Sequence, residues 1–383
     1  MRILQIHPLM KSEALSPAAG GMARASLQLT RLLLARGHDV QILPIPEGVG
    51  SRELWEVAPG RSAEVAAAMH IPAWKDGWWL PRALLRLNPL PAGIKNTFYD
   101  ALALTALRRE LEHFHPDIIH NHLARRPFPR LARALGLHGN LLLTHHHGEP
   151  GEELNAYDRI VFPSRASRGM IAAASRYPLE LTRVIYNPVA PVFGRPQTER
   201  AHPREGIVFV GAVRKRKGID ILFDAYRSDR RLRKEPLYIL GAGEDMALVE
   251  QAVKEGLPVH YPGKLAPSEV AARLRTAKLV VIPSRLEGFS IAILEAICCG
   301  APVVAWAPQV REVESFLGVP IGAPFDGRTQ TAQELVAAIC GVLDGELGST
   351  ASRRRMASAA REAFNEERCV DAYLDEYREM TGL

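Results

Sequence analysis

The chain has 383 residues, of which 47% are hydrophobic and 23% charged, a balance typical of a globular protein with two domains of ordinary size. A net charge of +6 permits attraction to phosphorylated ligands or to an anionic membrane face, but no motif typical of nucleic-acid binding is present. No apolar run reaches about 18 residues and no signal-peptide pattern opens the chain, so we expect a cytoplasmic protein and leave peripheral membrane contact open. The four cysteines lack metal-ligand or disulfide spacing, which indicates reduced packing residues.

The first predicted elements form a strand, a helix and a second strand. Residues 3–7 are a short apolar run, residues 22–37 carry leucines at helical spacing, and residues 40–43 form the next strand. Gly20 and Gly21 stand before the helix, where a double glycine allows close approach of backbone to an anion but is also typical of a flexible loop. The unit is βαβ, which favours a parallel sheet.

Residues 44–100 interrupt this alternation. Four of the five tryptophans lie here, interleaved with basic side chains: Trp55, Trp74, Trp78, Trp79, Lys75, Arg82, Arg86 and Lys95. Because aromatic side chains are usually buried, the first interpretation is the packing of an insertion. The alternative is an aromatic and basic surface for an amphipathic acceptor or for lipid headgroups.

Two later strands end in histidines. After a predicted helix over 100–113, residues 116–122 form a strand in which His120 and His122 share a face, because alternate strand positions point the same way. The strand over 141–144 runs into His145, His146 and His147. Consecutive strand residues point to opposite faces and neither group offers a third ligand on its own face, so both are poor zinc sites. A strand-end histidine is commonly a structural residue.

The second half follows a proline-rich linker over residues 188–204. The strand over 207–210 leads through Gly211 into four consecutive bases, 214–217, and then a helix. Four bases commonly form a solvated surface, but next to a glycine and a helix start they can also neutralise a pyrophosphate. The strand and turn over 237–243 suggest a dinucleotide fingerprint but lack its third glycine.

The chain is organised around residues 279–306. Residues 279–283 predict a short buried strand, Ser290 is expected to cap a helix that ends near Gly300, and residues 303–306 form the next strand. Beyond them we expect a Gly-Pro-rich stretch over 318–327, a helix over 331–343 and two closing helices over 351–380.

The turn between that strand and its helix has the chemistry of an anion site. Unpaired amides at a helix N-terminus, beside Gly288 with no Cβ, suit a phosphate or pyrophosphate. The carboxylates of Glu287 and Glu295 flank this turn and can accept hydrogen bonds from sugar hydroxyls on either side. The alternative is that Glu295 is paired with an arginine on a buried helix and that the turn is only a turn.

These residues resemble a known family. Residues 287–290, 295–296 and 299–304 together look like the Glu, seven residues, Glu signature of family 4 of the retaining glycosyltransferases, which have the GT-B fold. The similarity covers most of residues 1–310. It implies an α/β protein of two Rossmann-like domains whose parallel sheets face an interdomain cleft. Residues 1–187 would bind the acceptor and 205–365 the nucleotide sugar, with 366–383 returning to the first domain.

The resemblance implies a donor site around the turn. Glu287 would hold hydroxyls of the transferred sugar next to the reacting centre, and Glu295 would hold the ribose. The amides of Gly288, Phe289 and Ser290 would meet the diphosphate.

Basic residues complete this expected donor site. Lys217 matches the family lysine, but the family arginine is replaced by Ala212, so Arg214, and after it Arg216, is the expected substitute. The stretch over 259–265 resembles the family's base pocket, where Lys264 is expected to assist.

The resemblance also assigns residues of the first domain. The loop of Gly20 and Gly21 would approach the donor phosphates, with Arg24 on the acceptor side. His122 would reach the donor sugar next to the reacting centre. His145 or His146 would be the counterpart of the family's second strand-end histidine.

The expected reaction is transfer of a sugar, with retention, from a nucleoside diphosphate sugar to a hydroxyl of a saccharide, lipid-linked or small-molecule acceptor. The chain contains no Asp-x-Asp, so we expect no metal and no other cofactor. The resemblance implies a front-face mechanism in which the departing phosphate takes the acceptor proton. The alternatives are a nucleotide-sugar epimerase on the same fold and a non-catalytic nucleotide-binding protein. Two departures from the family pattern, Ala212 and Pro188, keep the second alternative open.

Overall fold

The computed structural model describes residues 1–7, 21–44, 53–58, 61–65, 107–122, 136, 139–146, 154–195 and 204–383. Contacts divide the chain into two units. Unit 1 consists of Met1–Phe162, Ile171–Ile185 and Val370–Leu383, and unit 2 of Pro163–Met170 and Tyr186–Cys369. The chain passes into the long segment of unit 2 between Ile185 and Tyr186, close to the predicted boundary at 187, and returns to unit 1 within its last helix. The excursion of 163–170 into unit 2 has no counterpart in the sequence pattern.

Unit 1 is built on an eight-stranded sheet with the strand order β3-β4-β2-β1-β5-β6-β7-β8. Its strands are β1 (Arg2–His7), β2 (Asp39–Pro44), β3 (Glu53–Ala58), β4 (Arg61–Val65), β5 (Ile118–Asn121), β6 (Leu141–Thr144), β7 (Arg159–Phe162) and β8 (Thr182–Val184). All neighbours are parallel except β3 and β4, which form an antiparallel pair at the edge. That pair occupies the part of the sequence where the βα alternation breaks. Trp55 lies in β3, and the other three tryptophans of the aromatic segment lie outside the described residues.

Helices cover both faces of this sheet. On one face lie α2 (Gly21–Ala35), whose Thr30 hydroxyl donates to Gln5 of β1, and the unit 1 part of α15 (Glu366–Thr381). On the other face, leucines and isoleucines of β1, β5, β6 and β7 pack with residues of the helical segment 107–114 and of α6 (Arg165–Ser175). The period-two alternation of strand side chains produces this division.

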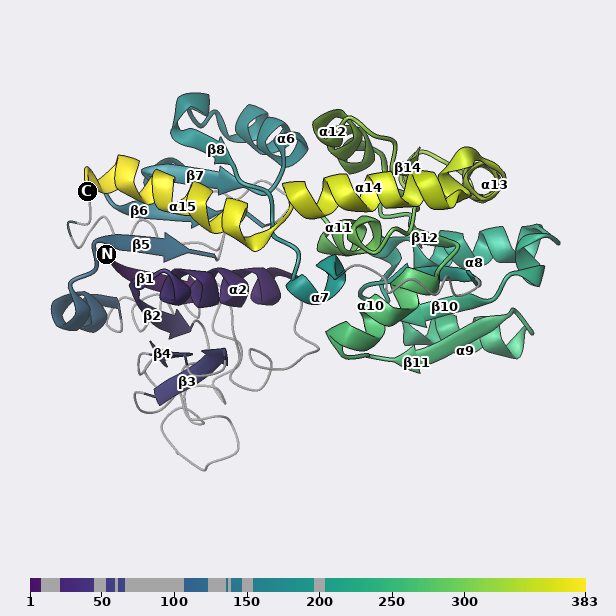
Figure 1. The fold of residues 1–383 in the computed structure, drawn as a ribbon, viewed down its shortest axis with the longest axis horizontal. Helices are drawn as coiled ribbons and strands as arrows, with labels where there is room; N and C mark the ends of the chain where they lie inside the picture. The colour runs from purple at the N-terminus through teal and green to yellow at the C-terminus, as the bar shows by residue number, and fades with distance from the viewer. Residues whose placement is uncertain are drawn as a thin grey trace, which may run out of the picture. The chain divides into compact units, whose positions relative to one another are not determined.

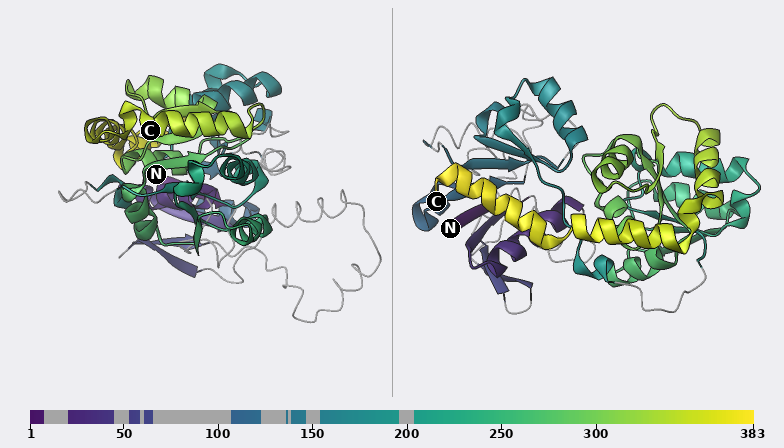
Figure 2. Two further views of the ribbon diagram at one scale, coloured as in Figure 1. Left: turned by 90° about the vertical axis from the view of Figure 1, so that its right-hand side faces the viewer. Right: turned by 45° about the horizontal axis from the view of Figure 1, so that its top comes forward.

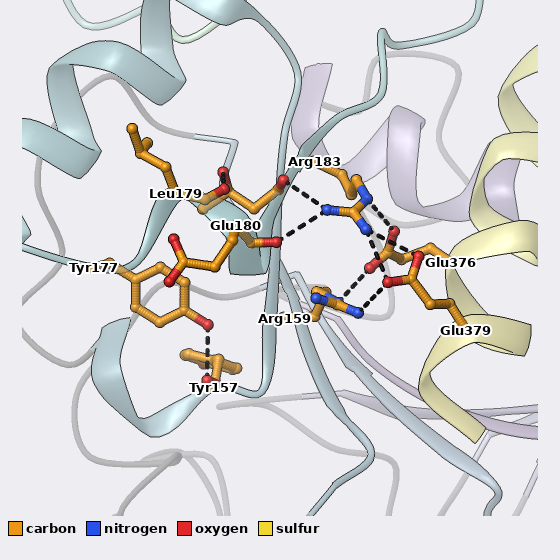
Figure 3. Close-up of polar contacts among 9 residues, drawn as sticks. Tyr157, Arg159, Tyr177, Leu179, Glu180, Arg183, Glu376 and Glu379 are labelled. Carbon is orange, nitrogen blue, oxygen red and sulfur yellow. Dashed lines mark hydrogen bonds and ion pairs between the residues drawn. The ribbon is translucent and has the colours of Figure 1, made fainter. Parts of the chain in front are cut away.

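The closing helix α15 is fixed to unit 1 by a cluster of two arginines and two glutamates (Figure 3). Glu376 pairs with Arg159 at 2.6 Å and with Arg183 at 3.1 Å, while Glu379 pairs with the same two arginines at 2.7 and 2.9 Å. Glu376 is buried and Glu379 is half exposed. Because a buried carboxylate is costly unless it is paired, this cluster requires α15 to dock in one register.

Unit 2 is built on a six-stranded parallel sheet with the order β11-β10-β9-β12-β13-β14 (Figure 1). Its strands are β9 (Ile207–Val210), β10 (Leu237–Leu240), β11 (Val259–Gly263), β12 (Leu279–Ile282), β13 (Val303–Trp306) and β14 (Gly322–Phe325). Its helices are α7 (Pro191–Gly194), α8 (Ile219–Ser228), α9 (Met246–Lys254), α10 (Pro267–Thr276), α11 (Ile291–Cys298), α12 (Ala307–Leu317), α13 (Ala332–Asp344) and α14 (Thr350–Ala363), with 3-10 turns that include η3 (Lys215–Lys217).

The helices of unit 2 form a layer on each side of its sheet (Figures 1 and 2). Val208 and Val210 of β9 point into a core shared with α10, α11, α12 and α14, whereas Ile207 and Phe209 point into a second core shared with α8, α9 and α13. The strand order is that of a doubly wound sheet, in which the direction of winding reverses between β9 and β12. The predicted class, two Rossmann-like α/β domains, is confirmed.

Two segments differ from the sequence-based expectation. Part of the predicted linker is helix α7, whose Phe193 side chain is buried in the core of unit 2. The Gly-Pro-rich stretch over 318–327, for which no strand is predicted, contains the edge strand β14, which pairs with β13 and buries Phe325. All four cysteines are free thiols, and no helix in the described part of the chain combines the length and apolarity that a bilayer crossing needs.

Candidate functional site

The predicted donor residues Lys217 and Glu287 meet where two neighbouring strands of unit 2 end. Lys217 lies in η3 after β9, and Glu287 lies in the turn after β12. The Lys217 Nζ donates to Glu287 Oε1 at 2.5 Å. In doubly wound sheets, ligands bind outside the carboxyl ends of the strands at the point where the winding reverses. These two side chains mark that point in unit 2.

Glu287 uses one carboxylate oxygen for both of its protein contacts. Oε1 accepts from Lys217 and, at 2.6 Å, from the hydroxyl of Ser284 in the same turn. Glu287 is only 6% exposed, so its negative charge is stabilised by these two donors rather than by water. No contact to Oε2 is found among the described residues, and that oxygen is therefore available to accept from a ligand hydroxyl.

Arg285 holds the two turns together. Its backbone N–H donates to the Arg216 carbonyl at 2.9 Å, and its guanidinium donates to the Lys215 carbonyl and, in a bidentate pair at 2.8 and 2.9 Å, to Asp220. A planar guanidinium fits a carboxylate in this geometry better than a lysine would. The register between the basic turn and the Glu287 turn is fixed by this residue.

The turn offers fewer amides to an anion than expected, because Gln309 binds one of them. The Ser290 N–H donates to Gln309 Oε1 at 2.8 Å, and Gln309 Nε2 donates back to the Ser290 carbonyl at 3.0 Å. Ser290 occupies the N-cap position of α11, but its hydroxyl makes no capping hydrogen bond, so the expected side-chain cap is wrong. Among the described residues, no acceptor is found for the amides of Gly288 and Phe289.

Glu295 lies within α11, eight positions after Glu287, and is 2% exposed. It has a polar partner, and its surroundings include the buried thiols of Cys298 and Cys299, whose pKa values are raised mainly by burial and also by this carboxylate. The residue is thus a buried carboxylate on the helix that begins at the turn. Its role towards the ribose stays a prediction.

The side chains of two other predicted donor residues make no hydrogen bond or ion pair with Lys217 or Glu287 in the part of the chain that the structure describes. Arg214 is half exposed and its Nε lies 3.5 Å from Glu244, in the turn after β10. Lys264 is exposed after β11. The strand β11 and the helix α10 line a groove of about 820 Å³ with Tyr238 and Arg273, and Lys264 is not among its lining residues.

In unit 1, four histidines cluster at the carboxyl ends of β1, β5 and β6. His122 Nδ1 lies 3.2 Å from His146 Nε2, and its ring centroid lies 5.1 Å from that of His7 and 4.1 Å from that of His120. Burial, reinforced by the neighbouring imidazoles, holds the pKa of His120 and His122 well below the usual range, and burial lowers the pKa of His7 to about 3. All three are neutral at pH 7.

The structure separates the histidines into different environments. His120 bonds on both sides, to the Tyr377 hydroxyl at 2.7 Å and to the Thr144 hydroxyl at 2.6 Å, which is a structural arrangement. His145 packs its ring against Phe162, away from this cluster, so of the two acceptor-side candidates only His146 stands beside His122. The Nε2 of His122 is buried and has no hydrogen-bond partner among the described residues.

The remaining predicted residues of unit 1 are placed only in part. Gly21 opens α2 and Arg24 lies in its first turns with polar contacts of its own, whereas Gly20 lies outside the described residues. Within the described ranges, no group of three or more His, Cys, Asp or Glu side chains is arranged to hold a metal ion.

Comparison with known families decides the identity of the fold. The family model described as "Glycosyltransferase Family 4" matches residues 19–193, and that described as "Glycosyl transferases group 1" matches residues 204–344. Together the two matches take in most of the chain, one in each half. The chain is a glycosyltransferase of the group 1/family 4 type.

Curated relatives share modest identity with this chain. A D-inositol 3-phosphate glycosyltransferase of Arthrobacter sp. (strain FB24) is 30% identical over 201 residues, which cover 46% of this chain and 45% of the relative. The chain thus matches about half the length of that relative. A protein of the same name from Mycobacterium tuberculosis (strain ATCC 25177 / H37Ra) is 26% identical over 427 residues, covering 99% of this chain and 83% of the relative.

Solved structures show the same fold. Sucrose-phosphate synthase from Thermosynechococcus elongatus matches with a TM-score of 0.73 at 19% identity, covering 100% of this chain and 99% of that chain. HepE of Anabaena, solved in complex with UDP-glucose, matches with a TM-score of 0.69 at 17% identity, covering 99% of this chain and 100% of that chain. At such identities the likeness concerns the fold alone, and it confirms the predicted GT-B class.

Several residues around this candidate site are not signalled by the sequence pattern. Ser284, Arg285 and Gln309 hold the turn through polar contacts described above. A fourth, Ser164, donates from its hydroxyl to the Gly288 carbonyl at 3.0 Å across 124 positions of sequence. Only Ser284 stands close enough in sequence to Glu287 for its contact to have been predicted.

Proposed function

We propose that this family 4 glycosyltransferase transfers a sugar, with retention of anomeric configuration, from a nucleoside diphosphate sugar to a hydroxyl acceptor. The observation that carries the proposal is the Lys217–Glu287 pair, at the end of β9 and β12, beside amides without protein acceptors. A cation, amides and a carboxylate together suit a ligand that joins a diphosphate to a sugar.

In this proposal the diphosphate lies against Lys217 and the amides of Gly288 and Phe289. The second oxygen of Glu287 accepts from hydroxyls of the transferred sugar. Glu295 holds the ribose, as the resemblance to the family implies. HepE, a structural neighbour, is solved in complex with UDP-glucose, which supports a nucleotide sugar as the ligand class.

The chemistry we propose needs no nucleophile from the protein. The bond from the anomeric carbon to the diphosphate oxygen breaks, the bond to the acceptor oxygen forms on the same face, and the acceptor proton passes to the departing diphosphate. Lys217 and the amides stabilise the charge that develops on the leaving group. We assign to His122, neutral at pH 7, the positioning of the sugar, and to His146 the support of His122.

We also propose that no metal ion is required. The chain has no Asp-x-Asp for binding a metal-diphosphate complex, and a lysine and helix-terminal amides can carry out the same charge compensation. Activity should therefore persist in excess EDTA.

A two-step experiment tests the function. Calorimetry with UDP, GDP and ADP should identify one diphosphate that binds, and the corresponding sugar nucleotides should then be incubated with acceptors. D-inositol 3-phosphate, which is named for several relatives, is the first acceptor to try. The expected result is a glycoside with the anomeric configuration of the donor, identified by NMR. Failure of all three diphosphates to bind would overturn the proposal, and an inverted product would overturn its mechanism.

Replacement of Glu295 tests the ribose contact. Glu295→Ala should raise the donor KM at least tenfold, because charge-assisted hydrogen bonds contribute on the order of 1.5–3 kcal/mol, with a smaller effect on kcat. An unchanged donor KM would contradict the assignment. Conversion of donor in the absence of any acceptor would indicate the alternative activity, an epimerase.

A further inference from the structure

We propose that Ser164 is a positioning residue of the donor site, which orients the amide of Phe289 towards the diphosphate. This inference deepens the proposed function and rests on it. Ser164 belongs to the excursion of residues 163–170 into unit 2. Its side chain is buried, and its hydroxyl lies 3.0 Å from the Gly288 carbonyl oxygen.

The direction of this hydrogen bond is fixed by chemistry. A carbonyl oxygen can only accept, so the Ser164 hydroxyl donates to it. The same hydroxyl oxygen accepts from the Ser167 backbone N–H at 2.9 Å. It also lies 2.8 Å from the Ser167 hydroxyl, whose own hydrogen has two acceptors in reach, the Ser164 hydroxyl and, at 3.1 Å, the Ser164 carbonyl. Ser164 therefore caps the start of α6 and holds the turn at the same time.

Holding the carbonyl of Gly288 also fixes the amide that follows it. A trans peptide unit is planar, and its C=O and N–H point in opposite directions. Because the Gly288 carbonyl points to Ser164, the Phe289 N–H points away from Ser164. No acceptor for this N–H is found among the described residues.

Neighbouring contacts distinguish this amide from that of Ser290. The Ser290 amide is held by Gln309, so it is not available to an anion. The ring centroid of Phe289 lies 5.4 Å from that of Tyr186. The side chain of Phe289 is therefore held by Tyr186, and the peptide unit before it is held by Ser164. The diphosphate would therefore meet the Phe289 amide, together with Lys217, rather than the Ser290 amide.

The helix that Ser164 caps does not depend on Ser164 alone. The amides of Arg165 and Ala166 donate to the carboxylate of Glu312 at 2.6 and 2.8 Å. Loss of the Ser164 hydroxyl thus leaves α6 with two of its first-turn amides satisfied. A Ser164 variant should consequently fold, and a change in its diphosphate affinity would reflect the loss of the contact with the Gly288 carbonyl.

The test compares Ser164→Ala with two control variants. Ser167→Ala removes a buried hydroxyl from the same helix turn without touching Gly288, and Ser164→Thr keeps the donating hydroxyl. Calorimetry measures the affinity for whichever of UDP, GDP and ADP the wild type binds. NMR line broadening measures the affinity for the matching nucleoside, which lacks the phosphates. Thermal unfolding checks that each variant folds.

Ser164→Ala should weaken diphosphate binding about three- to tenfold, the effect of one oriented hydrogen bond, and leave nucleoside binding unchanged. The diphosphate affinities of Ser167→Ala and Ser164→Thr should stay within about twofold of the wild-type affinity. Equal diphosphate affinity of Ser164→Ala and wild type, or equal losses for diphosphate and nucleoside, would overturn this inference alone. Absence of diphosphate binding by the wild type would overturn the proposed function and the inference with it.

Discussion

The carboxylate of Glu287 is nearly buried and depends on Lys217 for charge compensation. Removing the lysine leaves a buried charge with one neutral donor, Ser284, which is far more costly than losing an exposed pair. Lys217→Met should therefore lower the free energy of unfolding by about 3 kcal/mol. The neighbouring Lys215 is exposed, and Lys215→Met should change it by less than about 0.5 kcal/mol.

Urea unfolding of both variants measures this difference. A diphosphate titration of the same proteins should show weaker binding for Lys217→Met only. If both lysine variants lost the same stability, the pair would be a surface contact without an energetic role.

The histidines of unit 1 make stability depend on acidity. His7 has a pKa of about 3 in the folded protein against 6.5 when exposed, because burial disfavours its charged form. Between pH 6.5 and 3 the unfolded chain binds a proton at this position that the folded chain does not, so stability falls as the pH falls through that window. His120 and His122 act in the same direction.

Replacing His7 with glutamine removes one of these protons. In urea unfolding at a series of pH values from 6.5 to 4, the slope of unfolding free energy against pH should be smaller for His7→Gln by up to about 1.4 kcal/mol per pH unit. Identical slopes for variant and wild type would show that His7 is not a buried neutral group.

At this scale the sequence predicted residues but not all of their partners. The sequence predicts Glu287 and Lys217 as site residues because each stands in a turn after a strand and matches the family motif, and the structure brings their side chains together. Gln309 lies 19 positions from its partner Ser290, and Ser164 lies 124 positions from its partner Gly288. Neither contact can be predicted from the local sequence. The three consecutive histidines left His145 and His146 open, and only the strand pairing that aligns His120 with Leu142 settles which one faces His122.

At the scale of elements, the two turns that carry Lys217 and Glu287 approach each other at Gly218. This residue ends η3 with φ of +77°, and a Cβ built on it would lie 2.1 Å from the Pro283 carbonyl oxygen, at the end of β12. An L side chain is thus excluded by both backbone conformation and space. The approach of these two turns is what brings Lys217 to Glu287.

Gly218→Ala should separate the turns. We expect a loss of about 2–4 kcal/mol in unfolding free energy, from the strained conformation and the collision, and loss of detectable diphosphate binding. Gly256→Ala is a matched control, because Gly256 also has a positive φ, of +75°, but nothing lies within 4 Å of its added Cβ. Equal effects of the two substitutions would attribute the loss to backbone strain alone.

Short strands with β-branched residues, bounded by glycine or proline, were predicted well. The strands β9 and β13 have the predicted bounds, and β12 differs by one residue at its end. The edge strand β14 was not predicted, because a glycine and a proline within four residues, 322–325, are typical of a loop. In the structure β14 pairs with β13, and a Cβ added to Gly322 would lie 1.8 Å from the Val303 carbonyl oxygen, so only glycine fits there. Close backbone contact in three dimensions, not local propensity, selects a glycine there.

At the scale of the whole molecule, α15 returns the chain to unit 1 and is held there by Arg159 and Arg183 (Figure 3). Glu376→Ala should lower the unfolding free energy of the protein by about 3 kcal/mol, because it leaves these arginines beside an empty buried position. Glu379 binds the same arginines but is 51% exposed, so Glu379→Ala should cost less than about 1 kcal/mol.

Calorimetric unfolding of the two variants measures the contrast. A cost for Glu379→Ala as large as that for Glu376→Ala would mean that burial does not govern this cluster. The return of the last helix to the first unit was implied by the family resemblance. The particular ion pairs were not predictable, since a helix with acidic residues offers no sign of which distant arginines it will meet.

The return of residues 370–383 to unit 1 has a consequence for biosynthesis. Domains usually fold as they emerge from the ribosome, the earlier one first. Here Tyr377 and Tyr373 supply hydroxyl partners to His120 and Thr144 in the interior of unit 1. Unit 1 therefore lacks the hydroxyl partners of His120 and Thr144 until almost the entire polypeptide has been translated. A fragment prepared for study of unit 1 alone would have to carry that closing segment, for example through a fused or permuted gene.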